Sequence, residues 1–274
     1  MINIGWIKVN YFINLIELAN NENWIVGEDE LHFIYNNYPH LFFAAFDGDK
    51  PIGFITAVLH EKSSWIGNFI VKPDYRNQGV GKRLFKTLMK ALKLENRVIY
   101  LNANIDVIPF YAKFGFQPIV DICRFELNQK ININLSSNIA QELEVISSKN
   151  YYKTVFDEDR DIYLNSILSK SSLNLSTNNG FLHSKAIGKN IVVMPWIVKN
   201  GAYFDAEKLI RGLIYFRNGK KIVMDVPSIN IDAKTVITQY NFVESGKTTQ
   251  MVLGNKLNIR YDNIYAMPSL GAYG

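Results

Sequence analysis

A glycine-containing segment between an expected strand and an expected helix carries the clearest chemical signal of the sequence. Residues 71–82 read Val-Lys-Pro-Asp-Tyr-Arg-Asn-Gln-Gly-Val-Gly-Lys. Gly79 and Gly81 allow backbone N–H groups to approach a ligand phosphate without Cβ atoms in the way. The following helix N-terminus adds unpaired amides and a positive dipole end, and Arg76 and Lys82 add charge. The segment therefore predicts a phosphate-binding turn.

Two common nucleotide-binding motifs do not fit this segment. A Rossmann site needs a third glycine and an acidic residue after a strand at a set offset, and a Walker-type site needs G-K-[ST]; residues 71–82 contain neither pattern. A glycine pair after a strand can also mark a plain tight turn. The segment by itself leaves both explanations open.

A second segment with chemical potential lies downstream. Residues 110–116 read Phe-Tyr-Ala-Lys-Phe-Gly-Phe and follow an expected short strand at residues 98–101. A phenol such as Tyr111 can donate a proton to a developing anion. Spacing alone is equally consistent with Tyr111 as a half-buried aromatic residue of a helix.

Taken in this order, the two segments resemble motifs of the GNAT superfamily of N-acyltransferases. The acyl-CoA loop of that superfamily follows the pattern Q/R-x-x-G-x-G/A after a V-x-P-x-Y-R strand end, and residues 76–81 match every specified position. The second motif is a strand followed by a helix ending in F-Y-x-x-x-G-F, which residues 110–116 match. The resemblance covers about residues 1–127. It implies an α/β (α+β) fold, with a mixed, mostly antiparallel sheet flanked by helices.

The resemblance also implies a cofactor and roles for individual residues. Acetyl-CoA would be the acyl donor, with no metal. Backbone groups of Phe69, Ile70 and Val71 would pair with the pantetheine arm like an added strand. Asn104 would hydrogen-bond the pantetheine, and Tyr111 would protonate the departing thiolate. The pyrophosphate would be held by the loop and helix start, which comprise Arg76, Asn77, Gln78, Gly79, Val80, Gly81 and Lys82.

One position departs from the pattern of many relatives. They place a carboxylate six residues before the strand-ending valine, where it takes the proton from the amine, and this chain has Trp65 there. Glu61, His60 and Asp106 are nearby in sequence, and each is expected to be a surface residue. A water relay is an equally open alternative for the base.

The second half of the chain repeats the pattern of the first in a degenerate form. The strand and helix expected at residues 221–242 repeat those at 98–116, and counting back five from the closing Phe242 places Ile237 where the first lobe has Tyr111. No G-x-G precedes the helix expected at 206–216. We therefore expect a catalytic lobe at 1–130, a connection at 128–138 and a degenerate lobe at 139–274.

This second lobe is similar to the C-terminal lobe of bacterial tandem-GNAT proteins. Its recurring features match Phe156-x-x-Asp159-Arg160, Asp225-Val226-Pro227 and Ile264-Tyr265-Ala266 in this chain. It would have lost the means to bind CoA. Its use is either to wall the acceptor cleft of the first lobe or only to bury an exposed sheet edge.

Periodicity predicts the elements that position these motifs. Helices are expected at residues 10–19, 29–38, after Gly81, and at 107–114, 156–168, 206–216 and 231–240. Strands are expected at residues 41–46, 51–59, 64–71, 98–101, 119–127, 191–198, 221–226 and 248–253.

Composition narrows the class of protein. The chain has 274 residues, 48% hydrophobic and 20% charged, which suits one or two folded lobes rather than a disordered chain. The net charge of +5 is concentrated in residues 72–97, which favours a compact phosphorylated ligand over a long polyanion. Lys86, Lys90 and Lys93 are expected on a solvated helix face.

The single cysteine, Cys123, is expected to be buried, and four scattered histidines make a zinc site improbable.

We therefore expect an acetyl-CoA-dependent N-acetyltransferase that acts by direct attack in a ternary complex. The partner would be a small-molecule or peptide amine, without nucleic acid or membrane, and the protein a cytoplasmic monomer or homodimer. The alternative is a non-catalytic acyl-CoA-binding sensor or interaction module, which the replacement of a carboxylate by Trp65 favours.

Overall fold

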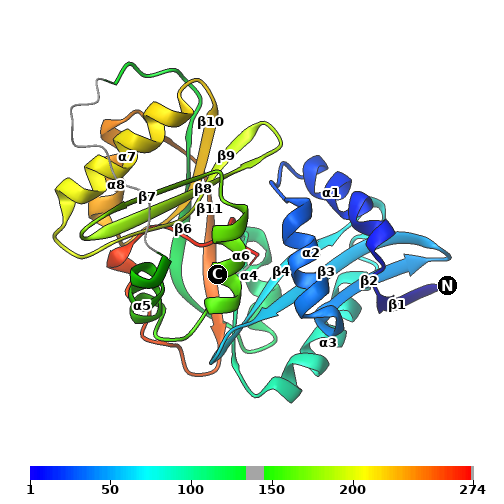
Figure 1. Cartoon of the computed structure of the whole chain (residues 1–274). Coiled ribbons are helices and arrows are strands. Elements are labelled where there is room, and N and C mark those ends of the chain that lie inside the picture. Colours follow the sequence, from blue (N-terminus) through cyan, green and yellow to red (C-terminus); the bar gives the residue numbers. More distant parts are fainter. Residues whose placement is uncertain (134–144, 273–274) are drawn as a thin grey trace. The chain divides into compact units, whose positions relative to one another are not determined.

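The chain forms two compact units in a computed structural model that describes residues 1–133 and 145–272 (Figure 1). One unit comprises Met1–Leu101 together with Gly271–Gly274, and the other comprises Asn102–Leu270. The connection expected at residues 128–138 is described in part. Residues 128–133 form no helix or strand, and the rest of it lies outside the described residues.

The first unit is built on a sheet whose strands lie side by side in chain order. Neighbours from β1 to β4 are antiparallel, whereas β4 and β5 are parallel. The last two residues of β5 belong to the second unit. The strands are β1 (Ile2–Trp6), β2 (Phe42–Asp47), β3 (Lys50–Leu59), β4 (Ser63–Val71) and β5 (Val98–Ala103).

Three helices accompany this sheet: α1 (Phe12–Asn21), α2 (Glu28–Asn37) and α3 (Val80–Leu92). The apolar side of α3 is buried, whereas Lys86, Lys90 and Lys93 are exposed, as the periodicity predicted. A Cβ on Gly53 of β3 would lie 3.2 Å from Leu84, so α3 covers the face of the sheet toward which Gly53 points. Short 3₁₀ turns comprise Val9–Tyr11, Pro39–Leu41, Pro73–Tyr75 and Lys93–Glu95.

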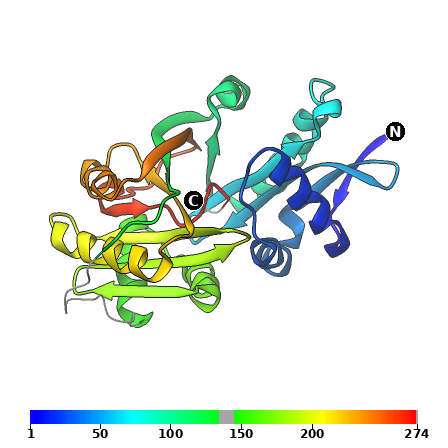
Figure 2. The same cartoon turned by 90° about the horizontal axis from the view of Figure 1, so that it is seen from above.

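The second unit holds the remaining strands in the order β11-β6-β10-β9-β8-β7, with β12 paired to β9. Helix α7 lies along one face of β7, β8 and β9 (Figure 2). The strands are β6 (Gln117–Leu127), β7 (Leu173–Thr177), β8 (Gly180–Ile187), β9 (Asn190–Val198), β10 (Lys221–Pro227), β11 (Val243–Leu253) and β12 (Ile264–Ala266). The helices are α4 (Ile108–Ala112), α5 (Val145–Phe156), α6 (Asp161–Lys170), α7 (Tyr203–Arg217) and α8 (Ile231–Gln239), with 3₁₀ turns at Ile105–Val107 and Tyr261–Asn263.

The strand connections of the second half repeat those of the first. The pairs β7–β8 and β8–β9 are antiparallel and β9–β10 is parallel, as β2–β3, β3–β4 and β4–β5 are. A helix joins the parallel strands in both halves, α3 in the first and α7 in the second. The expected duplication of a mixed, mostly antiparallel sheet flanked by helices is therefore confirmed.

One helix prediction is wrong. A single helix was expected at 156–168, but α5 ends at Phe156 and α6 begins at Asp161. Asp157 has a φ of 58°, a left-handed conformation that ends a helix. Its carboxylate accepts the Asn258 amide, and the Asp159 carboxylate accepts the Asp161 amide, so the acidic residues cap and brace a turn.

Other single-residue expectations can be compared directly. Cys123 is buried in the core between the sheet of the second unit and its helices, as predicted. Among the described residues no group of three or more His, Cys, Asp or Glu side chains could hold a metal ion. A search of the same residues finds no helix long and apolar enough to cross a membrane.

Candidate functional site

Strand β4 parts from its parallel neighbour halfway along its length. The register between β4 and β5 runs from Ser63–Val98 to Ile66–Leu101 and stops there, although β4 continues to Val71. Among the residues that the structure describes, 67–71, which include Phe69, Ile70 and Val71, pair only with β3, on the other edge of β4. The backbone edge of β4 in this notch is therefore available for an added strand, which is what the pantetheine contact requires.

A bulge marks the start of this notch. The register between β3 and β4 shifts between Thr56–Gly67 and Phe54–Ile70, and Asn68 has a φ of 49°. The side-chain amide of Asn68 donates from Nδ2 to Thr56 Oγ1 at 3.1 Å, and the Thr56 hydroxyl donates to the Gly67 carbonyl at 3.1 Å. These contacts brace the bulge that re-aims the strand. Sequence reasoning missed Thr56 and Asn68, because only strand pairing reveals a bulge.

The glycine segment forms an exposed loop that leads from β4 into α3. Asn77 and Gly79 have φ values of 60° and 80°, and a Cβ on Gly79 would meet no atom within 4 Å. Gly79 is the N-cap residue of α3 and carries no side chain that could occupy the helix N-terminus. Open amides at a helix N-terminus suit an anionic group. The loop therefore fits the phosphates of a CoA ester.

Gly81 has a different surrounding from Gly79. A Cβ on Gly81 would lie 3.4 Å from the ring of Phe69 and 3.7 Å from Val71, which are ordinary packing distances, so the first turn of α3 lies against the end of β4. Val80 is buried, whereas Gln78 and Lys82 are exposed. The close packing fixes the helix N-terminus beside the end of β4.

Arg76 is held by this chain's own groups. Its Nε donates to the Val71 carbonyl at 2.9 Å, and its Nη2 forms a salt bridge with Glu22, the residue that follows α1. Sequence reasoning named Arg76 but missed Glu22, which is 54 residues away in the chain. A phosphate that is to contact the Arg76 guanidinium has to compete with the Glu22 carboxylate.

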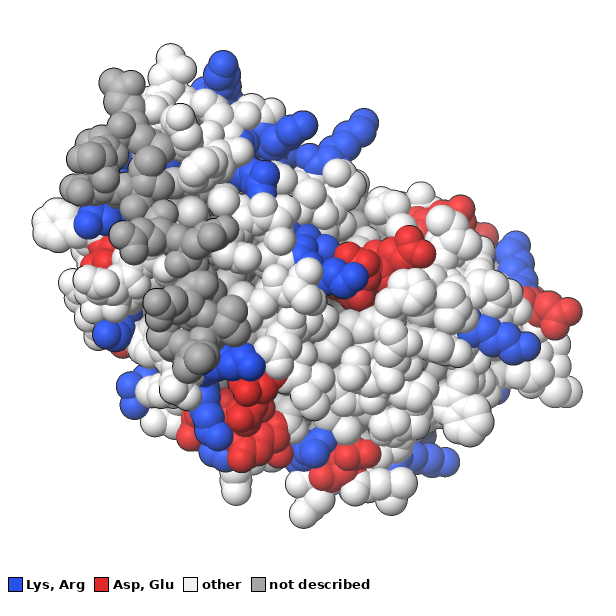
Figure 3. All heavy atoms as spheres, in the orientation of Figure 1, with Lys and Arg blue, Asp and Glu red and all other residues white. Residues whose placement is uncertain are grey.

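Charge on the protein surface is mixed in sign. On the face drawn in Figure 3, basic and acidic side chains lie in small groups beside one another. Within the basic stretch, Arg97 pairs with Glu95 at 3.6 Å and Arg83 donates to the Ile2 carbonyl at 2.9 Å. Such a surface favours a compact anion over a long polyanion.

Tyr111 lies in the second unit, at the end of the short helix α4. It is 6% exposed, and burial raises the pKa of its phenol, which keeps the hydroxyl protonated at neutral pH. Its ring lies edge-on to those of Phe110 and Phe116, with centroids 5.2 and 6.1 Å away. Gly115 closes the segment with a φ of 91°.

Asn104 is exposed at the start of the turn before α4, where its carbonyl accepts the Val107 amide at 3.0 Å.

Trp65 fills the position where relatives place a carboxylate. It is 1% exposed and stacks on Tyr100 with ring centroids 4.7 Å apart, and its indole N–H donates to Ser63 Oγ at 3.0 Å. The side chain thus serves packing, and its N–H cannot accept a proton.

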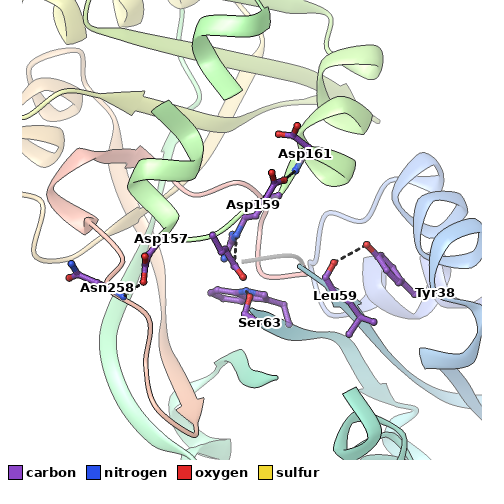
Figure 4. A network of polar contacts seen from close by, with 10 residues as sticks. Tyr38, Leu59, Ser63, Asp157, Asp159, Asp161 and Asn258 are labelled. Atoms are coloured by element: carbon purple, nitrogen blue, oxygen red, sulfur yellow. Dashed lines mark hydrogen bonds and ion pairs between the residues drawn. The ribbon is translucent and has the colours of Figure 1, made fainter. Parts of the chain in front are cut away.

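The other candidates for the general base, His60, Glu61 and Asp106, differ in whether they lie at the surface. His60 was expected at the surface but is 6% exposed; it lies in the β3–β4 turn, where its backbone amide donates to the Ser63 carbonyl at 2.8 Å. Beside it, the Tyr38 hydroxyl donates to the Leu59 carbonyl at 2.8 Å (Figure 4). Glu61 and Asp106 are exposed, as expected.

The second lobe has the same kind of notch, but the chain itself fills it. The β9–β10 register stops at Val192–Val223, while β9 continues to Val198. Strand β12 pairs with β9 there, and the Met267 amide donates to the Asp225 carbonyl at 2.7 Å. In addition, the loop that joins β9 to α7 comprises only residues 199–202, whereas the loop that joins β4 to α3 comprises residues 72–79. In the described part of this lobe, the notch beside β9 is therefore filled, and the loop that leads into α7 is shorter than the loop that leads into α3.

The recurring residues of the second lobe form structural contacts. Arg124 donates both Nε and Nη2 to the Asp225 carboxylate, at 2.8 and 2.9 Å, across neighbouring strands. Arg160 pairs with Glu158 at 2.8 Å with both side chains fully buried, and its guanidinium lies 4.1 Å from the ring centroid of Phe156. Removing one member of a buried pair leaves an uncompensated charge, so these residues are expected to support folding.

Comparison with protein families agrees with this geometry. A family model described as "Acetyltransferase (GNAT) family" matches residues 9–116, and one described as "Acetyltransferase (GNAT) domain" matches residues 149–266. The first match includes the notch, the loop and Tyr111, and the second covers the lobe whose notch β12 fills. No curated protein matches the chain.

Solved structures share the fold over nearly the whole chain. A proposed acetyltransferase from Pyrococcus horikoshii is 21% identical with a TM-score of 0.85, over 98% of this chain and 94% of that one. A GCN5-related N-acetyltransferase from Sphaerobacter thermophilus is 11% identical with a TM-score of 0.68, over 93% and 98%. A tandem GNAT protein from the clavulanic acid biosynthesis pathway is 10% identical with a TM-score of 0.65, over 94% and 100%. The chain therefore belongs to the GNAT acetyltransferase family, as a protein with two GNAT domains in tandem.

Proposed function

We propose that this protein is an acetyl-CoA-dependent N-acetyltransferase that acetylates the amine of a small molecule or peptide by direct attack in a ternary complex. The observation that carries the proposal is the release of β4 from β5 after Ile66, on the strand that leads into the exposed loop at 72–79. An open strand edge and a helix N-terminus together match a ligand with an amide-containing arm and phosphates.

The residues proposed to hold acetyl-CoA are those that the match to the GNAT motifs implies. Backbone groups of Phe69, Ile70 and Val71 pair with the pantetheine arm, and Asn104 hydrogen-bonds it. The pyrophosphate is bound by Arg76, Asn77, Gln78, Gly79, Val80, Gly81 and Lys82. When bound, acetyl-CoA supplies an activated acyl thioester.

Tyr111 is proposed as the general acid. As the amine nitrogen bonds to the acyl carbon, the carbon–sulfur bond breaks, and Tyr111 gives its Oη proton to the departing sulfur. A thiol, with a pKa of about 8.5, is a stronger acid than a phenol, so the proton moves only in concert with the breaking of the carbon–sulfur bond, and a proton from water then restores the Tyr111 phenol. Burial raises the pKa of the Tyr111 phenol, which holds the proton on Oη before the reaction and makes its release depend on charge that develops on the sulfur. The proton of the amine leaves through water, since Trp65 offers no acceptor.

The two lobes have different proposed tasks. Residues 1–130 form the catalytic domain that binds the acyl donor, and residues 139–274 form a degenerate domain that binds none. The notch that β12 fills supports this assignment.

The test of the proposed function is release of free thiol from acetyl-CoA in the presence of amines. The panel would include a polyamine, an aromatic amine, an amino acid and a lysine-containing peptide. Amine-dependent thiol release, with the acetylated amine identified by mass, supports the enzyme.

A second candidate function is a non-catalytic acyl-CoA sensor, which the buried Trp65 favours because no carboxylate stands in its place. Acetyl-CoA binding without thiol release for any amine would support the sensor. The enzyme and the sensor therefore give opposite results in the same assay.

A further inference from the structure

The chain after β12 returns to the first unit and lies directly against β4. A Cβ placed on Gly67 would lie 2.6 Å from the Ala272 Cα and 2.8 Å from the Ala272 carbonyl oxygen. Real Cβ atoms do not approach other heavy atoms so closely, so the backbone of Ala272 can lie there only because residue 67 has no side chain. Gly271 and Ala272 belong to the first unit. We call these two residues the strap.

The strap crosses β4 at the mouth of the notch. Gly67 is the first residue after the last β4–β5 pair, Ile66–Leu101, and it precedes the bulge residue Asn68. Its carbonyl is held by Thr56 Oγ1 at 3.1 Å, so the contact point is itself braced. The strap therefore covers β4 where the sheet opens.

The strap lies on the face of the sheet opposite α3. Gly53 points toward Leu84 of α3, and alternation along β3 turns Thr56 to the other face. Gly67 pairs with Thr56 and shares its face, and Trp65, two residues earlier on β4, shares it as well. The donor's phosphates are proposed at the α3 N-terminus, so the opposite face remains for the acceptor.

We propose that the strap is a specificity-determining wall of the acceptor site, which admits slender amines and shields the acyl carbon from water. This inference rests on the proposed function. The backbone of Gly271 and Ala272 and the methyl group of Ala272 carry no charge, so these two residues restrict the amine by its size.

Two variants test the wall: Gly67→Ala, which pushes the strap away, and a chain shortened after Leu270, which lacks it. Gly5→Ala is the matched control, because Gly5 also lies on a strand of the first unit and a Cβ there would meet only Phe46, at 3.9 Å. We expect both strap variants to release thiol from acetyl-CoA without amine at least about fivefold faster. They should also acetylate branched or bicyclic amines that the unchanged protein does not acetylate, and the shortened chain should keep its acetyl-CoA Kd within about twofold. Unchanged hydrolysis and acceptor range in both variants would overturn the proposal.

A readout independent of activity separates this proposal from the proposed function. Amide hydrogen exchange of residues 63–71 should be faster in the shortened chain than in the full chain, and unchanged in Gly5→Ala. If exchange is unchanged in the shortened chain, the strap does not cover β4 and the inference fails. If exchange rises but the intact protein binds no acetyl-CoA, the proposed function fails and the wall has no acyl donor to shield, which also refutes its proposed role.

Discussion

The amide of Phe116 donates a hydrogen bond to the carbonyl of Tyr111 at 3.3 Å. The second lobe repeats this bond between Phe242 and Ile237 at 3.2 Å. The residue before each phenylalanine has a positive φ, 91° at Gly115 and 60° at Asn241. The two segments thus keep one backbone geometry, while the phenol of the first is replaced by an aliphatic side chain in the second.

Replacement of Tyr111 by Phe should lower turnover by about 10²-fold or more, because a positioned general acid contributes that much. The acetyl-CoA Kd should stay within about twofold, since only the hydroxyl is lost. Steady-state thiol release and calorimetric titration measure the two quantities. Tyr240→Phe is the control, because it removes a hydroxyl bonded to Glu207 in the degenerate lobe. A loss of affinity equal to the loss of turnover would refute the role of Tyr111 in proton transfer.

Substitution of Gly79 by Ala should weaken acetyl-CoA binding by about tenfold or more. A left-handed conformation costs an alanine about 1–2 kcal/mol, and the loop would relax away from the φ of 80° that its open amides require. Gly48→Ala is a matched control, since Gly48 has a φ of 59°, also has open space around it, and lies in the β2–β3 turn. Both variants should lose comparable stability in thermal unfolding, but only Gly79→Ala should lose affinity. Equal affinities would mean that the loop is only a turn.

Glu22→Gln should tighten acetyl-CoA binding by about three- to tenfold. The carboxylate holds the Arg76 guanidinium, and its removal frees that charge for phosphate. Arg76→Ala should weaken binding and make the Glu22 substitution neutral. Titrations of the two single variants and the double variant form a thermodynamic cycle. Additive effects in that cycle would show that Glu22 does not act through Arg76.

Calorimetry of the intact protein should give one acetyl-CoA per chain. Strand β12 occupies in the second lobe the strand edge that stays open in the first, and the loop at 199–202 is too short to cradle phosphates. The Gly79→Ala variant should show no residual second site at high acetyl-CoA. Two equivalents per chain would contradict the assignment of a degenerate lobe.

Stability should fall steeply with acidification because of His183. Burial lowers the pKa of this imidazole to about 3, against about 6.5 in the unfolded chain, and its Nδ1 lies 2.7 Å from Asn174 Oδ1. Below pH 6.5 the His183 imidazole is protonated in the unfolded chain but stays neutral in the folded chain, so the free energy of unfolding decreases as the pH falls. Between pH 6.5 and 4.5 the loss from this group is about 2 kcal/mol.

Urea unfolding of His183→Gln at these two pH values measures that contribution. The variant should lose about 2 kcal/mol less than the unchanged protein over the interval. His32→Gln, which removes an imidazole from the exposed side of α2, retains His183 and should keep the steep dependence. Identical slopes for His183→Gln and the unchanged protein would contradict a neutral buried imidazole.

Local patterns in the sequence predicted most of the fold. The amphipathic spacing of Leu84, Phe85 and Leu88 and the turn around Gly48 are set by near neighbours, and the structure places the corresponding helix and hairpin where they were expected. Strands β7 and β8 were missed although Asn179-Gly180 is a hairpin signal between them. The edge strand β1 was also missed, because it is short and next to an irregular segment.

Long-range relationships could not be predicted in the same way. The pairing of β12 with β9 and the contact of Ala272 with Gly67 join residues far apart in sequence, and neither leaves a periodic pattern. The salt bridge of Glu22 with Arg76 depends on how α1 meets the loop. The loop residues themselves were found from the sequence, since glycine and basic residues at close spacing carry the signal locally.

The most direct measurement is a thermal-unfolding titration with acetyl-CoA, longer acyl-CoA esters and ATP. A ligand of the native state at about 100 times its Kd adds about 2.7 kcal/mol of stability, which for a chain of this size raises the Tm by several degrees. We expect acetyl-CoA to raise the Tm in a concentration-dependent way and ATP to leave it unchanged. No shift with any CoA ester would mean that the segment from Arg76 to Gly81 is a structural turn and that the protein is not an acyl-CoA-dependent enzyme.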